Sequence, residues 1–108
     1  VMEGERAYAT YNDPALTQRL VRAVQGELGA ANVVEVEPAM VGEDFGRFGL
    51  DQKIPVSMLV LGAADPARIR SGARLPSLHS SECAPPPELT LRTGVRTVTA
   101  AVLELMKR

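Results

Sequence analysis

The sequence has few of the residues that most often build covalent or metal-binding sites. Its 108 residues include one cysteine, Cys83, one histidine, His79, and no tryptophan. A single cysteine cannot form an internal disulfide, and it cannot supply the pair of thiolates found in many structural zinc sites. The cysteine count therefore offers no argument for an oxidising compartment.

An excess of charge of one sign is also missing. Twelve basic and thirteen acidic side chains give a net charge of -1. That balance provides no general attraction to nucleic acid or to an anionic membrane surface, so neither is expected as a partner. No apolar run approaches the roughly 20 residues that a membrane-spanning helix needs.

The composition that remains is that of an ordinary globular domain. Apolar residues make up 45% of the chain and charged residues 23%, close to the usual proportions of folded proteins. A chain of 108 residues is long enough for one domain with one modest core. Disorder is not expected, and no second complete domain fits.

Two stretches have the periodicity of amphipathic helices. The first follows Asp13-Pro14, a helix-start signal, and is ended by Gly29. The second begins at Pro87 and has the strongest periodic signal in the chain. Their apolar stripes consist of Leu16, Leu20, Val21, Val24 and Leu28 in the first helix, and of Leu91, Val95, Val98, Val102 and Leu105 in the second.

Three shorter stretches have strand character. Residues 33–37 have the pattern of a half-exposed strand, residues 56–61 are almost continuously apolar, and residues 6–11 carry β-favouring tyrosine and threonine. A continuously apolar strand is typical of a mainly parallel sheet covered on both faces. The alternation of strands and helices predicts an α/β fold, with a mainly parallel short sheet packed by the two amphipathic helices.

Two connecting stretches carry much of the polar chemistry. Residues 43–49 suit a short helix, with two carboxylates at its positive end and two phenylalanines on one side. Residues 62–78 have no periodicity and predict a long loop, a kind of segment that is often functional or mobile. Arg68, Arg70 and Arg74 in that loop are either a clamp for a carboxylate or, by default, a solvated surface.

His79 is the first candidate for a functional residue. It lies in a loop, residues 75–87, that leads into the last helix, and a neutral imidazole is the commonest metal ligand. A single histidine is more often an ordinary surface or hydrogen-bonded side chain, so it needs partners to form a site. Glu43 with Asp44 is either an acid–base or metal-binding pair or the acidic start of the short helix. Cys83 is either a thiolate ligand or a small buried apolar residue.

Other familiar catalytic motifs are absent. The chain has no glycine-rich phosphate loop, no His-Glu-x-x-His motif and no nucleophile elbow. Ser80 and Ser81 follow His79, but adjacent residues seldom face one another, and no aspartate is placed to orient the ring. A serine triad is therefore not expected.

The order of several short motifs is more specific than any one of them. In chain order they are Asn12-Asp13-Pro14, Met40-Val41-Gly42-Glu43-Asp44-Phe45, Leu59-Val60-Leu61-Gly62, Leu78-His79-Ser80-Ser81, and Ala84-Pro85 before a helix that contains Thr-Gly-Val. This order and spacing closely resemble the C-terminal portion of the two-metal aminoacylase and carboxypeptidase family. Members of that family include hippurate hydrolases, N-acyl-amino-acid amidohydrolases and indole-acetyl-amino-acid hydrolases. The resemblance extends from about Tyr8 to the end of the chain.

The resemblance implies an α/β catalytic domain of the zinc-peptidase type that is interrupted by a smaller lid domain. On that match, residues 1–11 form the last strand of the lid, and residues 12–108 form the C-terminal part of the catalytic domain. The lid also serves for dimerisation in the family, so a homodimer is one expected state.

The resemblance also assigns residues to a site. His79 corresponds to a ligand of one of two divalent metal ions, which could be Zn, Mn, Co or Ni. Gly42, Glu43 and Ser80 are placed near the substrate, a small N-acylated amino acid or peptide. Cys83 departs from the pattern, because many relatives have an aromatic residue there.

The family's general-base glutamate and its other metal ligands lie upstream of the matching portion. The chain is therefore expected to be a fragment of an amidohydrolase that holds at most one weak metal site and does not catalyse alone. The alternative, from the residues alone, is a stand-alone, non-catalytic α/β module that associates with itself or with a larger partner through an unpaired sheet edge.

Overall fold

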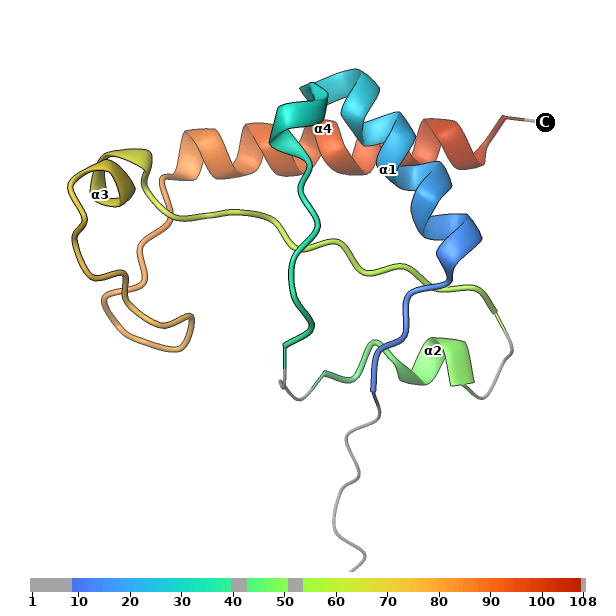
Figure 1. The fold of residues 1–108 in the computed structure, drawn as a ribbon, viewed down its shortest axis with the longest axis horizontal. Helices are drawn as coiled ribbons and strands as arrows, with labels where there is room; N and C mark the ends of the chain where they lie inside the picture. Colours follow the sequence, from blue (N-terminus) through green and yellow to red (C-terminus); the bar gives the residue numbers. More distant parts are fainter. Residues whose placement is uncertain (1–8, 40–42, 51–53, 108) are drawn as a thin grey trace, which may run out of the picture.

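The computed structural model describes residues 9–39, 43–50 and 54–107. Within them, helices supply all the regular secondary structure (Figure 1). In chain order the elements are α1 (Pro14–Leu28), the 3-10 turn η1 (Ala30–Asn32), α2 (Arg47–Leu50), α3 (Pro66–Arg70) and α4 (Pro87–Leu105). Of the strand predicted for residues 6–11, residues 6–8 lie outside the described residues, and residues 9–11 have no strand structure.

Helix α1 begins and ends where the sequence predicts. The Oδ1 atom of Asp13 accepts a hydrogen bond from the backbone N–H of Leu16 at 2.7 Å, which caps the first turn. Pro14 occupies the first helical position, where its missing N–H costs nothing. Gly29 ends the helix at φ 88°, a conformation that glycine adopts readily, and its N–H donates to the carbonyl of Gln25.

Helices α1 and α4 pack against each other and form the centre of the fold (Figure 1). Leu20 and Val24 of α1 are the only buried hydrophobic residues among the described residues. Two ion pairs connect the helices. Arg19 Nε lies 3.0 Å from Glu104 Oε1, and Arg96 Nε lies 2.7 Å from Glu27 Oε1.

Each arginine of these ion pairs also bonds the backbone of the opposite helix. Arg19 donates to the carbonyl of Glu104, and Arg96 Nη2 donates to the carbonyl of Glu27 at 2.7 Å. A planar guanidinium with several fixed donors suits such two-point contacts. The relative position of α1 and α4 is therefore set by polar contacts as well as by buried apolar side chains.

The apolar stripe predicted for α4 is present but faces solvent. Its five residues, given with their exposed fractions, are Leu91 (67%), Val95 (65%), Val98 (63%), Val102 (47%) and Leu105 (48%). The half-buried residues of the same helix are small or polar, and they include Gly94, Thr97, Ala100 and Ala101. The helix itself is confirmed, but within the described residues no other element covers its stripe. No helix in the described part of the chain is long and apolar enough to cross a bilayer.

The predicted α/β fold with a mainly parallel sheet is wrong for this structure. Residues 33–39 and 54–63 run without helical or strand structure, and the described part of the chain contains no strand. A strand requires a neighbouring strand that shares a ladder of backbone hydrogen bonds. Apolar and β-branched residues favour an extended backbone, but they do not supply that neighbour.

An asparagine side chain takes the place of a neighbouring strand for residues 54–61. Asn12 Oδ1 accepts from the backbone N–H of Met58 at 2.8 Å, and Asn12 Nδ2 donates to the carbonyl of Met58 at 3.0 Å. The N–H of Asp13 donates to the carbonyl of Val56 at 2.8 Å. These three bonds attach the extended segment to the start of α1.

Helix α3 lies inside the stretch that the sequence predicted to be a long loop. Asp65 Oδ1 accepts from the N–H of Ala67 at 2.8 Å, and Pro66 occupies the first helical turn. This start signal is the same as that of α1. Because α3 has only five residues, it is too short to show a helical period, and the loop prediction is corrected accordingly.

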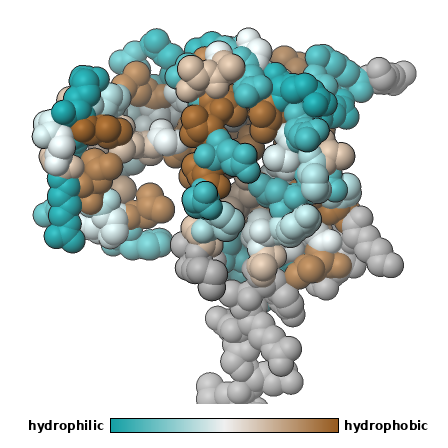
Figure 2. Space-filling model, viewed as in Figure 1, coloured by the Kyte–Doolittle hydropathy of each residue, from teal (hydrophilic) through white to brown (hydrophobic). Residues whose placement is uncertain are grey.

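The molecule is flat and open. Its principal extents are 48 × 46 × 22 Å and its Cα radius of gyration is 16.3 Å, whereas a compact domain of this length has a radius of about 13 Å. Hydrophobic side chains lie on the surface in Figure 2, over the segment that follows η1 and over α3 with its adjoining loop. Exposed residues there include Val34, Val36, Ile69 and Leu78.

Candidate functional site

His79 lies on an exposed turn between α3 and α4. The N–H of Ser80 donates to the carbonyl of Ser77 at 3.0 Å, and the N–H of Cys83 donates to the carbonyl of Ser80 at 3.0 Å. Ser80 Oγ accepts from the N–H of Glu82 at 3.1 Å. These bonds order the backbone on both sides of His79 and leave its imidazole facing solvent.

Glu43 is engaged with its own backbone. Its Oε1 atom accepts from the N–H of Asp44 at 2.9 Å and from the N–H of Phe45 at 3.2 Å. The side chain thereby shapes the turn before α2, and Asp44 pairs with Arg47 one turn later. Gly42 lies outside the described residues. The placement of Gly42 and Glu43 near a substrate stays a prediction.

The Phe pair predicted for the short helix is confirmed. The ring centroids of Phe45 and Phe48 lie 5.9 Å apart, with the rings tilted by 54°. This is a favourable separation for an aromatic pair. The helix begins later than the sequence suggested, at Arg47, because Glu43 and Asp44 form the turn that precedes it.

The described residues do not bring the predicted site residues together. In Figure 1 the loop that carries His79 lies beside α3, and the segment that begins at Glu43 lies near α2, on another part of the molecule. Among the described residues, no group of three or more histidine, cysteine, aspartate or glutamate side chains is arranged to hold a metal ion. Cys83 is a half-buried free thiol.

This donor set is too small for a two-metal centre. Zinc-type centres need several nitrogen, oxygen or sulfur donors around each ion, supported by groups that orient them. The chain offers the imidazole of His79 on an ordered turn, and the further donors would have to come from residues outside the described part. His79 therefore remains a predicted ligand for one ion.

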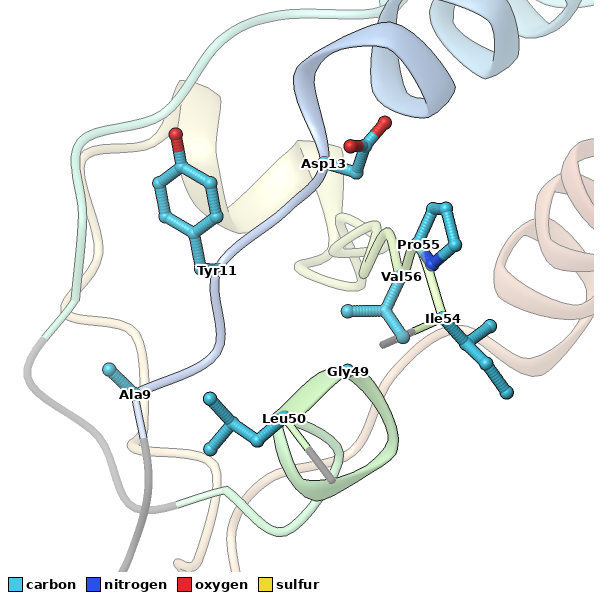
Figure 3. A pocket seen from close by; sticks show the side chains of 9 residues that line it. Ala9, Tyr11, Asp13, Gly49, Leu50, Ile54, Pro55 and Val56 are labelled. Atoms are coloured by element: carbon cyan, nitrogen blue, oxygen red, sulfur yellow. The ribbon is translucent and has the colours of Figure 1, made fainter. Parts of the chain in front are cut away.

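A hollow of about 290 Å³ lies elsewhere, between residues 9–13, α2 and the start of the extended segment (Figure 3). Its lining is mainly apolar and includes Ala9, Tyr11, Leu50, Ile54 and Val56. Asp13, a carboxylate in the described lining, already caps α1. Among the described residues, the lining contains no histidine and no pair of carboxylates.

Two glycines of the α2 region allow the backbone to approach closely around this hollow. A Cβ atom on Gly46 would lie 2.9 Å from the carbonyl oxygen of Ala9, and one on Gly49 would lie 2.9 Å from Val56 Cγ2. Sequence reasoning did not single out these glycines, although their spacing of three is a signal that places both on one side of a short helix.

The clearest electrostatic perturbation lies away from His79. Hydrogen bonds from Lys107 and then from Arg19 lower the pKa of Glu104 below its ordinary value of 4.5. Lys107 Nζ lies 2.6 Å from Glu104 Oε2. This effect belongs to the contact between α1 and α4 and to no candidate active site.

Comparison with known proteins identifies the family. The peptidase family M20/M25/M40 matches residues 2–104 of the chain. The N-acetyldiaminopimelate deacetylase of Limosilactobacillus fermentum is 42% identical over 66 residues, which are 61% of this chain and 16% of that protein. The enzyme of the same name from Limosilactobacillus reuteri is 34% identical over 88 residues, 82% of this chain and 20% of that protein.

A third relative, the N-acetyldiaminopimelate deacetylase of Lactobacillus acidophilus, is 32% identical over 95 residues, 88% of this chain and 22% of that protein. The chain thus spans about a fifth of the length of the curated relatives it matches. No solved structure matches the chain. The order of short motifs, from Asn12-Asp13-Pro14 to Leu78-His79-Ser80-Ser81, predicted the outcome correctly: the chain belongs to the peptidase family M20/M25/M40 and matches a C-terminal portion of it.

Proposed function

We propose that this chain is the C-terminal part of a metal-dependent amidohydrolase that removes the acyl group from an N-acylated amino acid. The observation that carries the proposal is the family match over residues 2–104, together with relatives that are named N-acetyldiaminopimelate deacetylases. Those names point to an N-acetylated diamino acid as the substrate class. An N-acetylated diamino acid is one specific kind of the N-acyl amino acids that the sequence resemblance implies.

In this proposal, His79 contributes one ring nitrogen to one of two divalent ions. A bound divalent ion would supply Lewis-acid polarisation of the scissile carbonyl. The hydrogen bonds of the turn around Ser80 restrain the backbone that carries the imidazole, and a restrained ligand loses less entropy when it binds a metal ion. The other donors and the general base are assigned to parts of the enzyme outside this chain.

Ser80 and Glu43 have narrower roles. Ser80 Oγ accepts one backbone hydrogen bond, so its hydroxyl proton remains for a hydrogen bond to the substrate. Glu43 uses Oε1 for the backbone of its own turn, which leaves Oε2 to face an ammonium or amide group of the substrate. Gly42 would allow the substrate to approach the backbone closely, because it has no side chain.

The main test uses the full-length enzyme that contains this chain, with the variant His79→Ala and the neighbouring exposed Ser81→Ala as its matched control. We expect His79→Ala to lower the number of divalent ions bound per protein, measured by calorimetric titration. We also expect it to reduce kcat/KM by roughly 100-fold or more. Unchanged metal stoichiometry and activity in His79→Ala would refute the ligand assignment.

A second comparison separates the two roles of Glu43. Glu43→Gln keeps an oxygen acceptor for the N–H groups of Asp44 and Phe45 but removes the negative charge. If the carboxylate faces the substrate, Glu43→Gln raises KM and Glu43→Ala raises it further. If the side chain only shapes the turn, Glu43→Gln behaves like the unmodified enzyme and only Glu43→Ala is impaired.

A second candidate function is association without catalysis, and the exposed apolar stripe of α4 favours it. A contiguous apolar surface of this kind often marks a contact with another protein. Analytical ultracentrifugation of the 108-residue chain over a range of concentrations tests this reading. A stable self-associated species, together with no activity in the full-length protein, would favour the association function over the hydrolase.

A further inference from the structure

The stretch from residue 66 to residue 81 carries charge of one sign. It contains three arginines and His79 but no aspartate or glutamate, although the whole chain has twelve basic and thirteen acidic side chains. The three arginines, Arg68, Arg70 and Arg74, are all exposed. In Figure 2, hydrophilic side chains form much of the outer edge of the part of the molecule that contains α3. Such a stretch attracts anions, because no acidic residue within it offsets its charge.

Within the described residues, these three arginines lack the carboxylate partners that most other cations have. Five cations form ion pairs with a carboxylate, at distances between 2.6 and 3.7 Å, and they are Arg19, Arg47, Arg92, Arg96 and Lys107. The nearest acid to Arg68 in the sequence, Asp65, caps α3 through its Oδ1 atom. A guanidinium group without an ion pair keeps its fixed N–H donors available for a ligand.

The turn that ends α3 brings the first and the last of these arginines together. The N–H of Ala73 donates to the carbonyl of Arg68 at 3.2 Å. The N–H of Gly72, which has φ 69°, donates to the carbonyl of Ile69 at 3.1 Å. These two bonds form a Schellman turn, which ends a helix and redirects the chain. Arg68 Nη2 lies 3.5 Å from the carbonyl oxygen of Arg74, so the two residues share one small area of the surface.

A carboxylate fits this pair of arginines by shape as well as by charge. A planar guanidinium binds a carboxylate through two parallel N–H···O bonds. The curated relatives are named N-acetyldiaminopimelate deacetylases, and diaminopimelate is a dicarboxylic acid with one amino group beside each carboxylate. When the acylated end of such a molecule lies at the reacting centre, its second carboxylate lies at the far end and needs a cationic partner of its own.

We propose that Arg68 and Arg74, with Arg70 beside them, bind the far carboxylate of a dicarboxylic N-acylated amino acid. They thereby select this substrate over one with a single carboxylate. The inference rests on the proposed function, in which His79 holds an ion at the scissile amide. Arg74 precedes His79 by five residues, which span at most about 18 Å, and α3 lies beside the loop that carries His79 (Figure 1). Both ends of one substrate therefore bind to the same stretch of chain.

The test compares two substrates in the full-length enzyme, N-acetyldiaminopimelate and Nα-acetyl-lysine. The second compound has the same carbon chain and ammonium group but lacks the far carboxylate. We expect Arg68→Gln combined with Arg74→Gln to raise KM for N-acetyldiaminopimelate roughly 10-fold or more, because charge-assisted hydrogen bonds are lost. The value of kcat should not change, since the far carboxylate is bound equally in the ground state and the transition state. Both constants for Nα-acetyl-lysine should stay the same.

Two further variants sharpen the comparison. Arg22→Gln on α1 is the matched control, because Arg22 is an exposed arginine that also has no ion pair within the described part of the chain. It should leave the constants of both substrates unchanged. Arg68→Lys combined with Arg74→Lys keeps the charge but loses the two-point geometry of the guanidinium groups. We expect an intermediate rise in KM for N-acetyldiaminopimelate.

The outcomes separate this inference from the proposed function. Equal losses for both substrates in the double glutamine variant would overturn the selective role, and so would an unchanged KM for N-acetyldiaminopimelate; both results leave the hydrolase assignment intact. If the full-length enzyme hydrolyses neither compound, the proposed function fails. Calorimetric titration with the two compounds then decides on binding alone. A preference for the dicarboxylate that the double glutamine variant abolishes supports the inference, and equal affinities overturn it.

Discussion

Helices α1 and α4 have the same amphipathic design, but only one of them has its apolar face covered. In α1, Leu20 and Val24 are 6% and 4% exposed, whereas Leu91 and Val98 of α4 are more than half exposed. Both helices begin with proline in the first turn, and both are held by the same two ion pairs. The difference shows that periodicity defines an apolar face without defining what covers it.

The contact between the two helices explains which face of α4 packs against α1. Ala100 and Ala101 are small and half-buried, so the side of α4 on which they lie allows another helix to approach closely. Glu104 and Arg96 extend from α4 to charged partners on α1. The aliphatic side of α4 has no such partner in the described residues. Substitutions on either helix can test this difference between the covered face of α1 and the exposed stripe of α4.

The largest effect is expected from truncating the covered face. Leu20→Ala should lower the free energy of unfolding of the chain by about 2–4 kcal/mol, because it removes a buried side chain and leaves a cavity. Val98→Ala on the uncovered face should change it by less than about 0.5 kcal/mol, as is usual for exposed positions. Urea titration followed by circular dichroism measures both. Equal losses would show that the stripe of α4 is covered in solution.

The next effect concerns the attachment of the extended segment to α1. Asn12→Ala removes both hydrogen bonds to Met58 and should cost about 1–3 kcal/mol, because it leaves the backbone groups of Met58 without partners. Asn12→Asp keeps the acceptor and loses the donor, so its cost should be smaller. Hydrogen exchange at the Met58 amide should accelerate in Asn12→Ala. An unchanged exchange rate would mean that the anchor is not formed.

A smaller effect is expected where α4 meets residue 61. Gly94→Ala replaces glycine inside a helix, which favours the helix by up to about 1 kcal/mol. The new Cβ atom would lie 3.3 Å from Leu61 Cδ2, the end of a flexible side chain that can move slightly. We therefore expect a small gain in thermal midpoint. A loss would show that Leu61 is held tightly against α4, and Gly26→Ala in α1, where nothing lies within 4 Å, is the matched control.

The smallest effect is electrostatic. Because Lys107 and Arg19 lower the pKa of Glu104 in the folded chain, this carboxylate favours folding above its unfolded pKa. This contribution to stability is lost as the pH falls from 4.5, the ordinary pKa of the carboxyl group, through the lower pKa that Glu104 has in the folded chain. Glu104→Gln should thus reduce the acid-induced decrease in thermal midpoint. Glu35→Gln, which removes an exposed carboxylate on the segment after η1, is the control, and an equal change in both variants would contradict the expectation.

Local signals predicted the two long helices, α1 and α4, well. Asp13-Pro14, Gly29 and Pro87 marked the ends of α1 and the start of α4 correctly, because caps and proline act within one or two turns. The same start signal at Asp65-Pro66 did not lead to a predicted helix, because α3 is too short to show a helical period. The family was also predicted, because the order of short motifs is a property of the sequence that needs no structure.

The predicted sheet and the predicted site both depend on contacts between residues that are far apart in the sequence. Residues 33–37 and 56–61 have strand-like composition, but a strand exists only where another strand pairs with it. His79 could be singled out by its motif, while the donors that would complete a metal site cannot be inferred from one imidazole. The roles of His79, Glu43 and Ser80, and that of Gly42 outside the described residues, stay predictions.

The sequence by itself determined where α1 begins and ends, where α4 begins, which face of each of these two helices is apolar, and to which family the chain belongs. These properties depend on neighbouring residues and their order. Only the tertiary structure decided that Leu20 and Val24 are buried while the stripe of α4 is exposed. It also decided that Asn12 pairs with Met58 and that Glu43 holds its own turn. Burial and pairing are shared between segments far apart in the chain, so they follow from which surfaces meet in space.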